Sequence, residues 1–248
     1  MERRSALVLI PAFFGYLSFG YLRDLALGQE ALGQENNVYI KDVGYVSSSN
    51  SNWNERPEIS IPTTEQTIHI LTNQERYKES MRTRKKIPQL GWDAGLANIA
   101  RSHSRDMSEN DFFSHDNRRG MNPTARADAY GYAHKRETIK EEKRPDGSTV
   151  VTTSIKNGIG ENIFMHLIFS SFNPITTTQT INGRTVSTKK EYHFNWNSQN
   201  SISSGVVEGW MNSQGHRKNI LNPEYRKEGI GAFLSYEKNH VMVTQNFW

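Results

Sequence analysis

The apolar positions of this chain recur with a helical period in several stretches, which predict a domain beginning at Thr63. The first stretch, residues 67–86, ends in basic residues that suit a helix C-terminus. Residues 63–66 (TTEQ) fit a capping box in front of it. Asp93 is the expected N-cap of a second helix, whose apolar face is Leu96, Ile99, Ala100, His103 and Met107.

Two further helices are expected later in the chain. Asn122-Pro123 combines a capping side chain with proline at the first helical position, which predicts a short helix that closes at Gly131. The last helix is expected to follow a cap at Ser203 or Ser204, with Trp210 in the core.

Strands are predicted by alternating β-prone residues around tight turns. Residues 137–156 are expected to turn at Asp146-Gly147, and residues 174–194 at Asn182-Gly183. Both ribbons are polar on two faces, so they are expected to project from the body. Residues 229–237 and 240–248 read as two more strands joined at Lys238-Asn239. Helices flanking a mainly antiparallel sheet predict an α+β sandwich.

The N-terminus indicates export. Arg3 and Arg4 precede the apolar run of residues 6–22, which is shorter than the ~20 residues that span a bilayer. Residues 1–28 are therefore expected to be a signal peptide or an N-terminal membrane anchor, and residues 29–62 a linker. In either case the domain over residues 63–248 is expected to be extracellular or at the cell surface.

Composition narrows the function classes. The 248 residues contain no cysteine, which excludes disulfides, thiolate metal sites and a cysteine nucleophile. The net charge is only +4, with no long basic block, so a nucleic-acid partner is not expected.

Five motifs in order resemble one family. They begin at Leu71 (LTNQERYKE), Leu90 (LGWDAGLANIARSHSRDMSENDFFSH), Gly158 (GIGENIF), Val206 (VVEGWMNSQGHRKNILNPEYRKEGIGAF) and Val241 (VMVTQNFW). Together they resemble the CAP superfamily, or SCP domain, in its prokaryotic secreted branch. The resemblance implies a three-layer α-β-α sandwich, in which the segments at about 134–157 and 167–200 are inserted hairpins.

The resemblance also implies a cleft with two histidines and two acidic residues. Residue by residue, these fall on His115, Glu161 and His216, while Ser213 stands where the second acid is expected. Asn162 and Arg217 are secondary candidates for the same cleft.

Three roles are open for His115, Glu161 and His216. Two imidazoles and one carboxylate are a plausible ligand set for a divalent metal such as zinc, although no cofactor is required. A metal-bound water would in turn support hydrolysis. Alternatively, Glu161 fixes the entry of its strand, and the histidines clamp loops by hydrogen bonding to it.

The other polar candidates have structural interpretations. His103 is expected to be a core histidine, with Asp106 as its partner one turn later. His69, His134, His166, His193 and His240 have no companions at ligand spacing.

The sequence therefore favours an exported, monomeric and non-catalytic module that binds a divalent metal or an unknown small or lipid-like ligand in a His/Glu cleft. A metal-assisted extracellular hydrolase is one alternative, which the missing second acid disfavours. A surface protein that contacts a partner through its hairpins is the other. Membrane contact is expected through the N-terminal segment if that segment is not cleaved.

Overall fold

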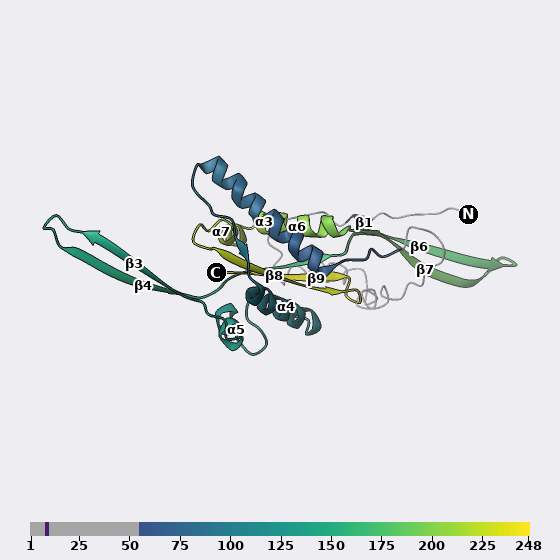
Figure 1. The fold of residues 1–248 in the computed structure, drawn as a ribbon. Coiled ribbons are helices and arrows are strands. Elements are labelled where there is room, and N and C mark those ends of the chain that lie inside the picture. The colour runs from purple at the N-terminus through teal and green to yellow at the C-terminus, as the bar shows by residue number, and fades with distance from the viewer. Residues whose placement is uncertain (1–7, 10–54) are drawn as a thin grey trace.

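The computed structural model describes residues 8–9 and 55–248, whose arrangement Figure 1 shows. They form a mixed helix and strand fold around a four-stranded sheet in the order β2-β8-β9-β5. Strand β9 pairs antiparallel with both β8 and β5, whereas the short β2 runs parallel to β8. The strands are Gly91–Trp92 (β2), Gly160–Leu167 (β5), Lys227–Ser235 (β8) and His240–Phe247 (β9). The predicted, mainly antiparallel sheet is confirmed.

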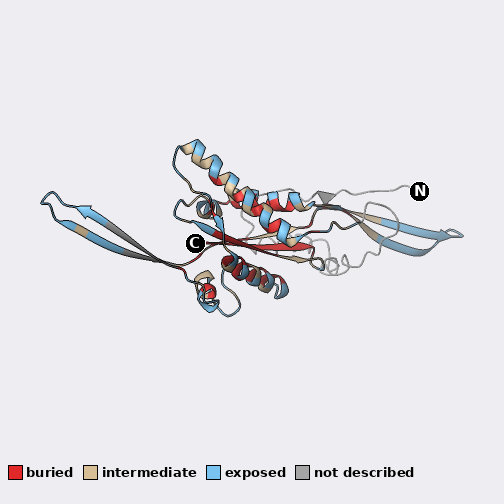
Figure 2. Ribbon diagram, in the orientation of Figure 1, coloured by how far each residue is buried: buried red, intermediate tan, exposed pale blue. Residues whose placement is uncertain are grey.

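Helices cover both faces of this sheet (Figure 1). On one face α4 packs against β8 and β9, with α5 beside it. On the other face α3 packs on α6 and β8, while α6 and α7 pack on β5. The helices are Ile61–Thr83 (α3), Ala94–Glu109 (α4), Pro123–Ala129 (α5), Gln199–Asn212 (α6) and Gln214–Ile220 (α7). Buried residues gather in the sheet and on the helix sides that face it (Figure 2), which confirms the three-layer sandwich.

Two glycines allow α4 to lie directly on β8. A Cβ atom at Gly229 would stand 2.1 Å from the backbone nitrogen of Ala97, and one at Gly231 would stand 2.0 Å from that of Arg101. These neighbours are backbone atoms, which cannot turn aside as a flexible side chain can. The contact between α4 and the sheet therefore requires residues without a side chain at both positions.

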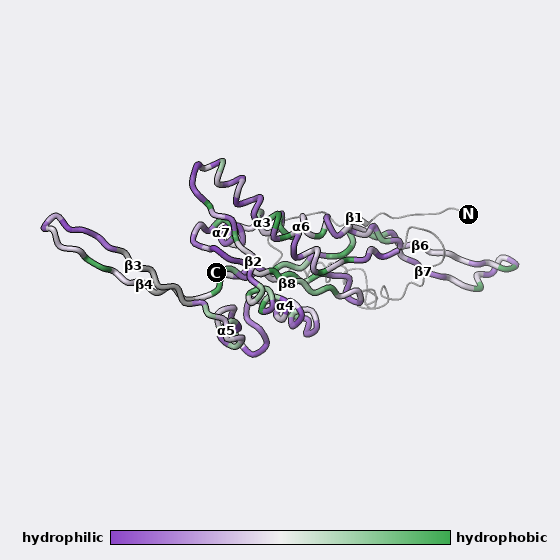
Figure 3. The backbone as a smooth tube through the Cα atoms, in the orientation of Figure 1, coloured by the Kyte–Doolittle hydropathy of each residue, from purple (hydrophilic) through white to green (hydrophobic). Residues whose placement is uncertain are grey.

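The two predicted hairpins are present and extend from opposite ends of the sandwich (Figure 1). Gly147 has φ +86° in the first turn, and Asn182 and Gly183 have φ +51° and +74° in the second. The second turn therefore has positive φ at both central residues, as a type I′ hairpin turn needs. Hydrophilic residues follow the outer parts of both ribbons (Figure 3). The strands are Lys135–Lys143 (β3), Thr149–Asn157 (β4), Phe169–Ile181 (β6) and Arg184–Trp196 (β7).

Aromatic side chains hold the base of the second hairpin. Phe194 and Trp196 stack with ring centroids 4.8 Å apart, and Phe169 meets Phe194 edge-on at 5.1 Å. The two-residue strand β1, Val8–Leu9, pairs antiparallel with β6 near this base.

The expected capping box over residues 63–66 is wrong. The first helix begins at Ile61, and its N-cap is Ser60, whose Oγ accepts a hydrogen bond from the backbone N–H of Thr63. Pro62 then lies in the first turn, where a helix needs no N–H from it. The helix therefore starts earlier than the apolar period alone suggested.

The expected cap of the last long helix is also wrong. Ser198 is the N-cap of α6 and accepts from the N–H of Ser201 at 3.1 Å. Ser203 instead lies inside the helix, where its Oγ donates to the carbonyl oxygen of Gln199 at 3.0 Å. A buried serine that bonds back to the preceding turn needs no cap role.

The expected signal peptide or anchor, residues 1–28, lies outside the described residues except for 8–9. Of the expected linker, only residues 55–62 are described. Ile59 is buried, and the Arg56 guanidinium lies 5.5 Å from the Trp196 ring, so the end of this segment packs on the domain. Among the described residues, no helix combines the length and apolarity needed to cross a bilayer.

Adding a methyl group at Gly231 should separate α4 from β8. We expect Gly231→Ala to lower the free energy of unfolding by about 2–3 kcal/mol, because the backbone of α4 must shift. Gly215→Ala is the matched control, since a Cβ there meets nothing within 4 Å. Urea denaturation of both variants checks this, and equal stability of the two would contradict the packing described for α4.

Candidate functional site

The predicted site residues come from three parts of the fold. Glu161 and Asn162 are successive residues of the edge strand β5, so their side chains point to opposite faces of the sheet. His115 lies in the loop between α4 and α5, and His216 lies in the first turn of α7. The strand therefore stands between one layer that supplies His115 and another that supplies His216.

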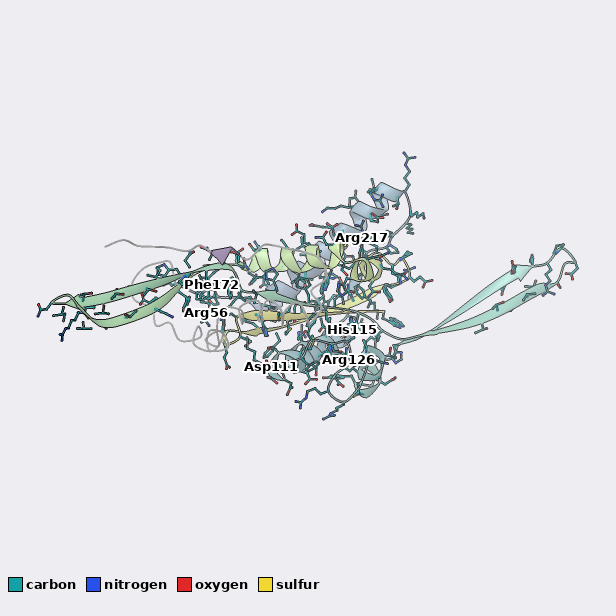
Figure 4. The ribbon with its side chains drawn as sticks, turned by 180° about the vertical axis from the view of Figure 1, so that it is seen from behind. Arg56, Asp111, His115, Arg126, Phe172 and Arg217 are labelled. Carbon is teal, nitrogen blue, oxygen red and sulfur yellow. The ribbon has the colours of Figure 1, made fainter. Side chains whose placement is uncertain are left out.

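Both oxygens of the Glu161 carboxylate have partners. Oε1 accepts from Nδ1 of His115 at 2.9 Å, and Oε2 accepts from Nη2 of Arg126. Arg126 also donates through Nη1 to the carbonyl oxygens of His115 at 2.5 Å and Met121 at 2.9 Å. Figure 4 shows His115 and Arg126 close together beside α5. The carboxylate is almost fully buried, so these bonds replace its hydration.

His103 is a buried residue of α4 that lies next to this carboxylate. Its Nε2 bonds to the carbonyl oxygen of Ser114 at 2.9 Å and lies 4.0 Å from Oε1 of Glu161. Burial lowers the pKa of His103, so the ring is held neutral. The expected partner Asp106 is wrong, because its Oδ1 accepts instead from Asn110.

Asn162 joins the opposite face of β5 to α7. Its Nδ2 donates to the carbonyl oxygen of His216 at 3.2 Å and to Oε1 of Gln245 at 3.1 Å. Asn219 donates to Oδ1 of Asn162 at 2.9 Å and to the carbonyl oxygen of Glu161 at 3.1 Å. The backbone at His216 is therefore fixed to the strand that carries Glu161.

A buried arginine holds the other end of α7. Arg76, on α3, donates from Nη1 to the carbonyl oxygens of Ile220 at 2.6 Å and Asn222 at 3.0 Å. Its Nε donates to the carbonyl oxygen of Pro88 at 2.7 Å. The carbonyl groups of Ile220 and Asn222 lie at and just beyond the end of α7, where carbonyls have no partner within the helix. The short α7 is thus anchored at both ends.

The ring of His216 is neutral and lacks hydrogen-bond partners among the described residues. Burial, with a smaller contribution from the nearby His115, lowers its pKa from 6.5 to about 4. Its buried Nδ1 has no partner, and the same is true of Nδ1 in His103 and Nε in Arg126. Two of these unpartnered atoms thus belong to neighbours of Glu161, and the third belongs to a neighbour of His115.

Ser213 and Arg217 contribute differently from the histidines. Ser213 is buried between α6 and α7, but its side chain makes no cap hydrogen bond. Arg217 is exposed and turned towards α3, with its Nη2 3.8 Å from Oε2 of Glu79. Figure 4 shows it well away from His115 and Arg126. The cleft carboxylate is therefore paired with Arg126, not with Arg217.

The arrangement does not fit a metal site with three protein ligands. A guanidinium and an imidazole N–H already occupy the two oxygens of Glu161, and a metal would have to displace one of them. Across the described part of the chain, no group of three His, Asp or Glu side chains is placed to hold an ion. Of the three predicted ligands, His115 and His216 each keep a ring nitrogen that makes no hydrogen bond among the described residues.

Sequence reasoning missed Arg126, His103 and Asn219 as members of the site. Arg126 has at most a weak signal in its position between two alanines of a short helix, because its burial beside Ala127 depends on how that helix packs. Asn219 has no signal of its own, since its role depends on how α7 meets β5.

Acid should destabilise the protein through His216. Between pH 6.5 and 4 the unfolded chain binds a proton at this ring that the folded chain does not. The free energy of unfolding therefore decreases as the pH is lowered through this range. We expect His216→Gln to remove about 1–2 kcal/mol of the loss between pH 7 and pH 5. His240→Gln should act similarly, because burial lowers the pKa of His240 to about 4. Denaturant titrations at both pH values test this, and an unchanged pH dependence in His216→Gln would contradict it.

Comparison with known proteins gives two curated relatives, both from Bacillus subtilis (strain 168). The uncharacterized membrane protein YlbC is 27% identical over 185 residues, which cover 75% of this chain and 34% of YlbC. The uncharacterized protein YkwD is 26% identical over 188 residues, covering 76% of this chain and 48% of YkwD. This chain thus spans less than half the length of either relative.

Two solved structures are similar at low identity. An extracellular protein containing a SCP domain from Bacillus anthracis str. Ames matches with TM-score 0.46 and 23% identity, covering 85% of this chain and 48% of that one. An outer surface protein from Borrelia burgdorferi matches with TM-score 0.47 and 14% identity, covering 77% and 96%. The family model for CAP, the cysteine-rich secretory protein family, matches residues 70–247. The chain therefore belongs to the CAP family.

Proposed function

We propose that this CAP domain is an exported binding module that holds a divalent cation, such as zinc, between His115 and His216 and does not catalyse a reaction. The export part of the proposal rests on the charged and apolar N-terminus. The binding part rests on the geometry around Glu161.

The observation that carries the proposal is the group of unpartnered polar atoms. Seven buried side-chain atoms in the described residues lack a hydrogen-bond partner. Two of them belong to His103 and Arg126, which lie beside the Glu161 carboxylate, and a third belongs to His216, which lies near His115. Buried polar groups are normally paired, so such a group marks a place where a ligand or bound water completes the structure. All three atoms belong to, or lie beside, residues predicted for the site.

The state of each imidazole suits a cation. Glu161 accepts from Nδ1 of His115, which turns Nε2 of that half-exposed ring outward as an acceptor. A carboxylate bonded to the far nitrogen is the usual support for an imidazole that binds a metal. His216 is neutral at physiological pH, because burial lowers its pKa to about 4. A bound cation would supply a positive centre that accepts further ligands.

Glu161 acts as a positioning residue in this proposal. A general base must have an oxygen within hydrogen-bond reach of the proton it removes. Both oxygens of Glu161 are already engaged, by His115 and by Arg126. Ser213 stands where the second acid is expected, which leaves the cleft without another carboxylate from that position. These features argue against a hydrolase.

A partner-binding role of the hairpins is a second candidate. Val151 lies on β4, and Ile181 and Val186 lie near the tip of the β6–β7 hairpin; all three are large exposed apolar residues. The hairpins extend in opposite directions, so they could contact a partner independently of the cleft (Figure 1).

Zinc titration calorimetry tests the main proposal. We expect about one equivalent of zinc to bind the wild-type protein, and no binding by the folded His115→Ala/His216→Ala variant. Glu161→Gln keeps both imidazoles but weakens the support of His115, so its affinity should fall about 10–100-fold. His193→Ala is the matched control, because it removes a histidine outside the cleft.

Two outcomes would contradict the proposal. The first is a folded wild-type protein that does not bind zinc or another divalent cation. The second is a Glu161→Gln variant with unchanged affinity, since the carboxylate would then not orient His115.

A further inference from the structure

The outward face of α3 carries a row of large apolar side chains. Ile70, Tyr77 and Met81 are 48%, 59% and 65% exposed, and their spacing of seven and four residues places them along one side of the helix. The opposite side is buried against the domain through residues that include Ile68, Thr72 and Arg76. The described residues contain eight large exposed apolar side chains, and three of them lie in this row.

The same end of the helix concentrates the positive charge of the chain. Residues 78–86 contain five basic residues and one acidic residue. Their net charge of +4 equals that of all 248 residues. The remainder of the chain therefore has equal numbers of basic and acidic residues, and the excess basic residues lie next to Tyr77 and Met81.

Among the described residues, part of this charge has no ion-pair partner. Lys78 pairs with Glu75 and Arg82 with Glu79, each at 2.6 Å. Arg84, Lys85 and Lys86 follow the last turn of the helix and are exposed. The C-terminal end of α3 projects beyond the neighbouring elements (Figure 1), and the ribbon there is coloured as exposed (Figure 2).

We propose that this face docks on an anionic lipid bilayer. We define the α3 surface as Ile70, Tyr77, Met81, Arg84, Lys85 and Lys86. Cations at its end would bind acidic headgroups, while the apolar row enters the boundary between headgroups and acyl chains. This combination of a basic region with exposed apolar side chains is the pattern of helices that lie in a membrane interface.

The apolar row is the reason to favour a bilayer over a soluble polyanion. Binding to a polyanion requires the cations alone and leaves Tyr77 and Met81 in water. A bilayer removes both from water and also attracts Lys85 and Lys86. The α3 surface excludes the cleft histidines, so this inference is independent of cation binding by His115 and His216.

A fluorescent label on α3 can detect this contact directly. The chain has no cysteine, so Gln74→Cys places a single polarity-sensitive dye between Ile70 and Tyr77. Thr188→Cys, on the exposed outer part of β7, is the matched control label. The full chain is mixed with phosphatidylcholine vesicles that contain either no phosphatidylglycerol or about one third of it. Because the readout is local, insertion of the N-terminal segment alone does not mimic it.

We expect a blue shift of the dye at position 74 with anionic vesicles only, and none at position 188. Lys85→Glu/Lys86→Glu should lower the apparent vesicle affinity about 30-fold or more, and salt should weaken binding. Tyr77→Ser/Met81→Ser should lower it about tenfold by removing apolar contact. Lys189→Glu/Lys190→Glu is the charge-matched control, and it should leave the affinity unchanged.

Several results would overturn the proposal. One is no spectral change at position 74 with anionic vesicles. Another is an equal change at positions 74 and 188. A response to soluble polyphosphate, but not to vesicles, would assign the cations to a polyanion. A response without vesicles that grows with protein concentration would assign the surface to self-association.

Discussion

The carboxylate of Glu161 determines the geometry of the candidate site, because its two oxygens tie separate parts of one layer to an edge strand. His115 binds one oxygen and Arg126 the other, so the loop after α4 and the helix α5 are fixed to β5 at one point. Removing one partner from such a buried pair leaves an uncompensated charge, which typically costs about 3–5 kcal/mol. The adjacent Asn162 points to the other face of the sheet, where its Nδ2 donates a hydrogen bond to the carbonyl oxygen of His216. Alternation along a single strand thus fixes the His115 ring on one face and the backbone of His216 on the other.

Much of the fold could be predicted because its signals are local. Asp93 caps α4 and Asn122 caps α5 as expected, and the Asp-Gly and Asn-Gly pairs form the predicted hairpin turns. The two wrong caps have a common cause. Several serines or threonines precede each of those helices, and the sequence does not show which hydroxyl bonds to a neighbouring turn and which to the first N–H groups. That choice depends on which residues the tertiary structure buries.

The site was less predictable, because it depends on contacts between distant residues. The motifs indicated His115, Glu161 and His216, but not that Arg126 would occupy the second oxygen of Glu161. That contact engages the second oxygen of an expected metal ligand. It also separates two surfaces of the molecule. The surroundings of Glu161 are organised by buried hydrogen bonds, whereas the α3 surface consists of exposed apolar and basic residues.

Nitrogen-15 NMR of the histidine rings tests the central role of Glu161 most directly, because it reports which ring nitrogen carries the proton. The account predicts that neutral His115 is protonated at Nδ1, where it donates to Glu161, and that Glu161→Gln weakens this preference. It also predicts that His216 stays neutral as the pH falls to about 4. A His115 ring protonated at Nε2 in the wild-type protein would contradict the account, because the outward nitrogen could not then act as a donor to a cation.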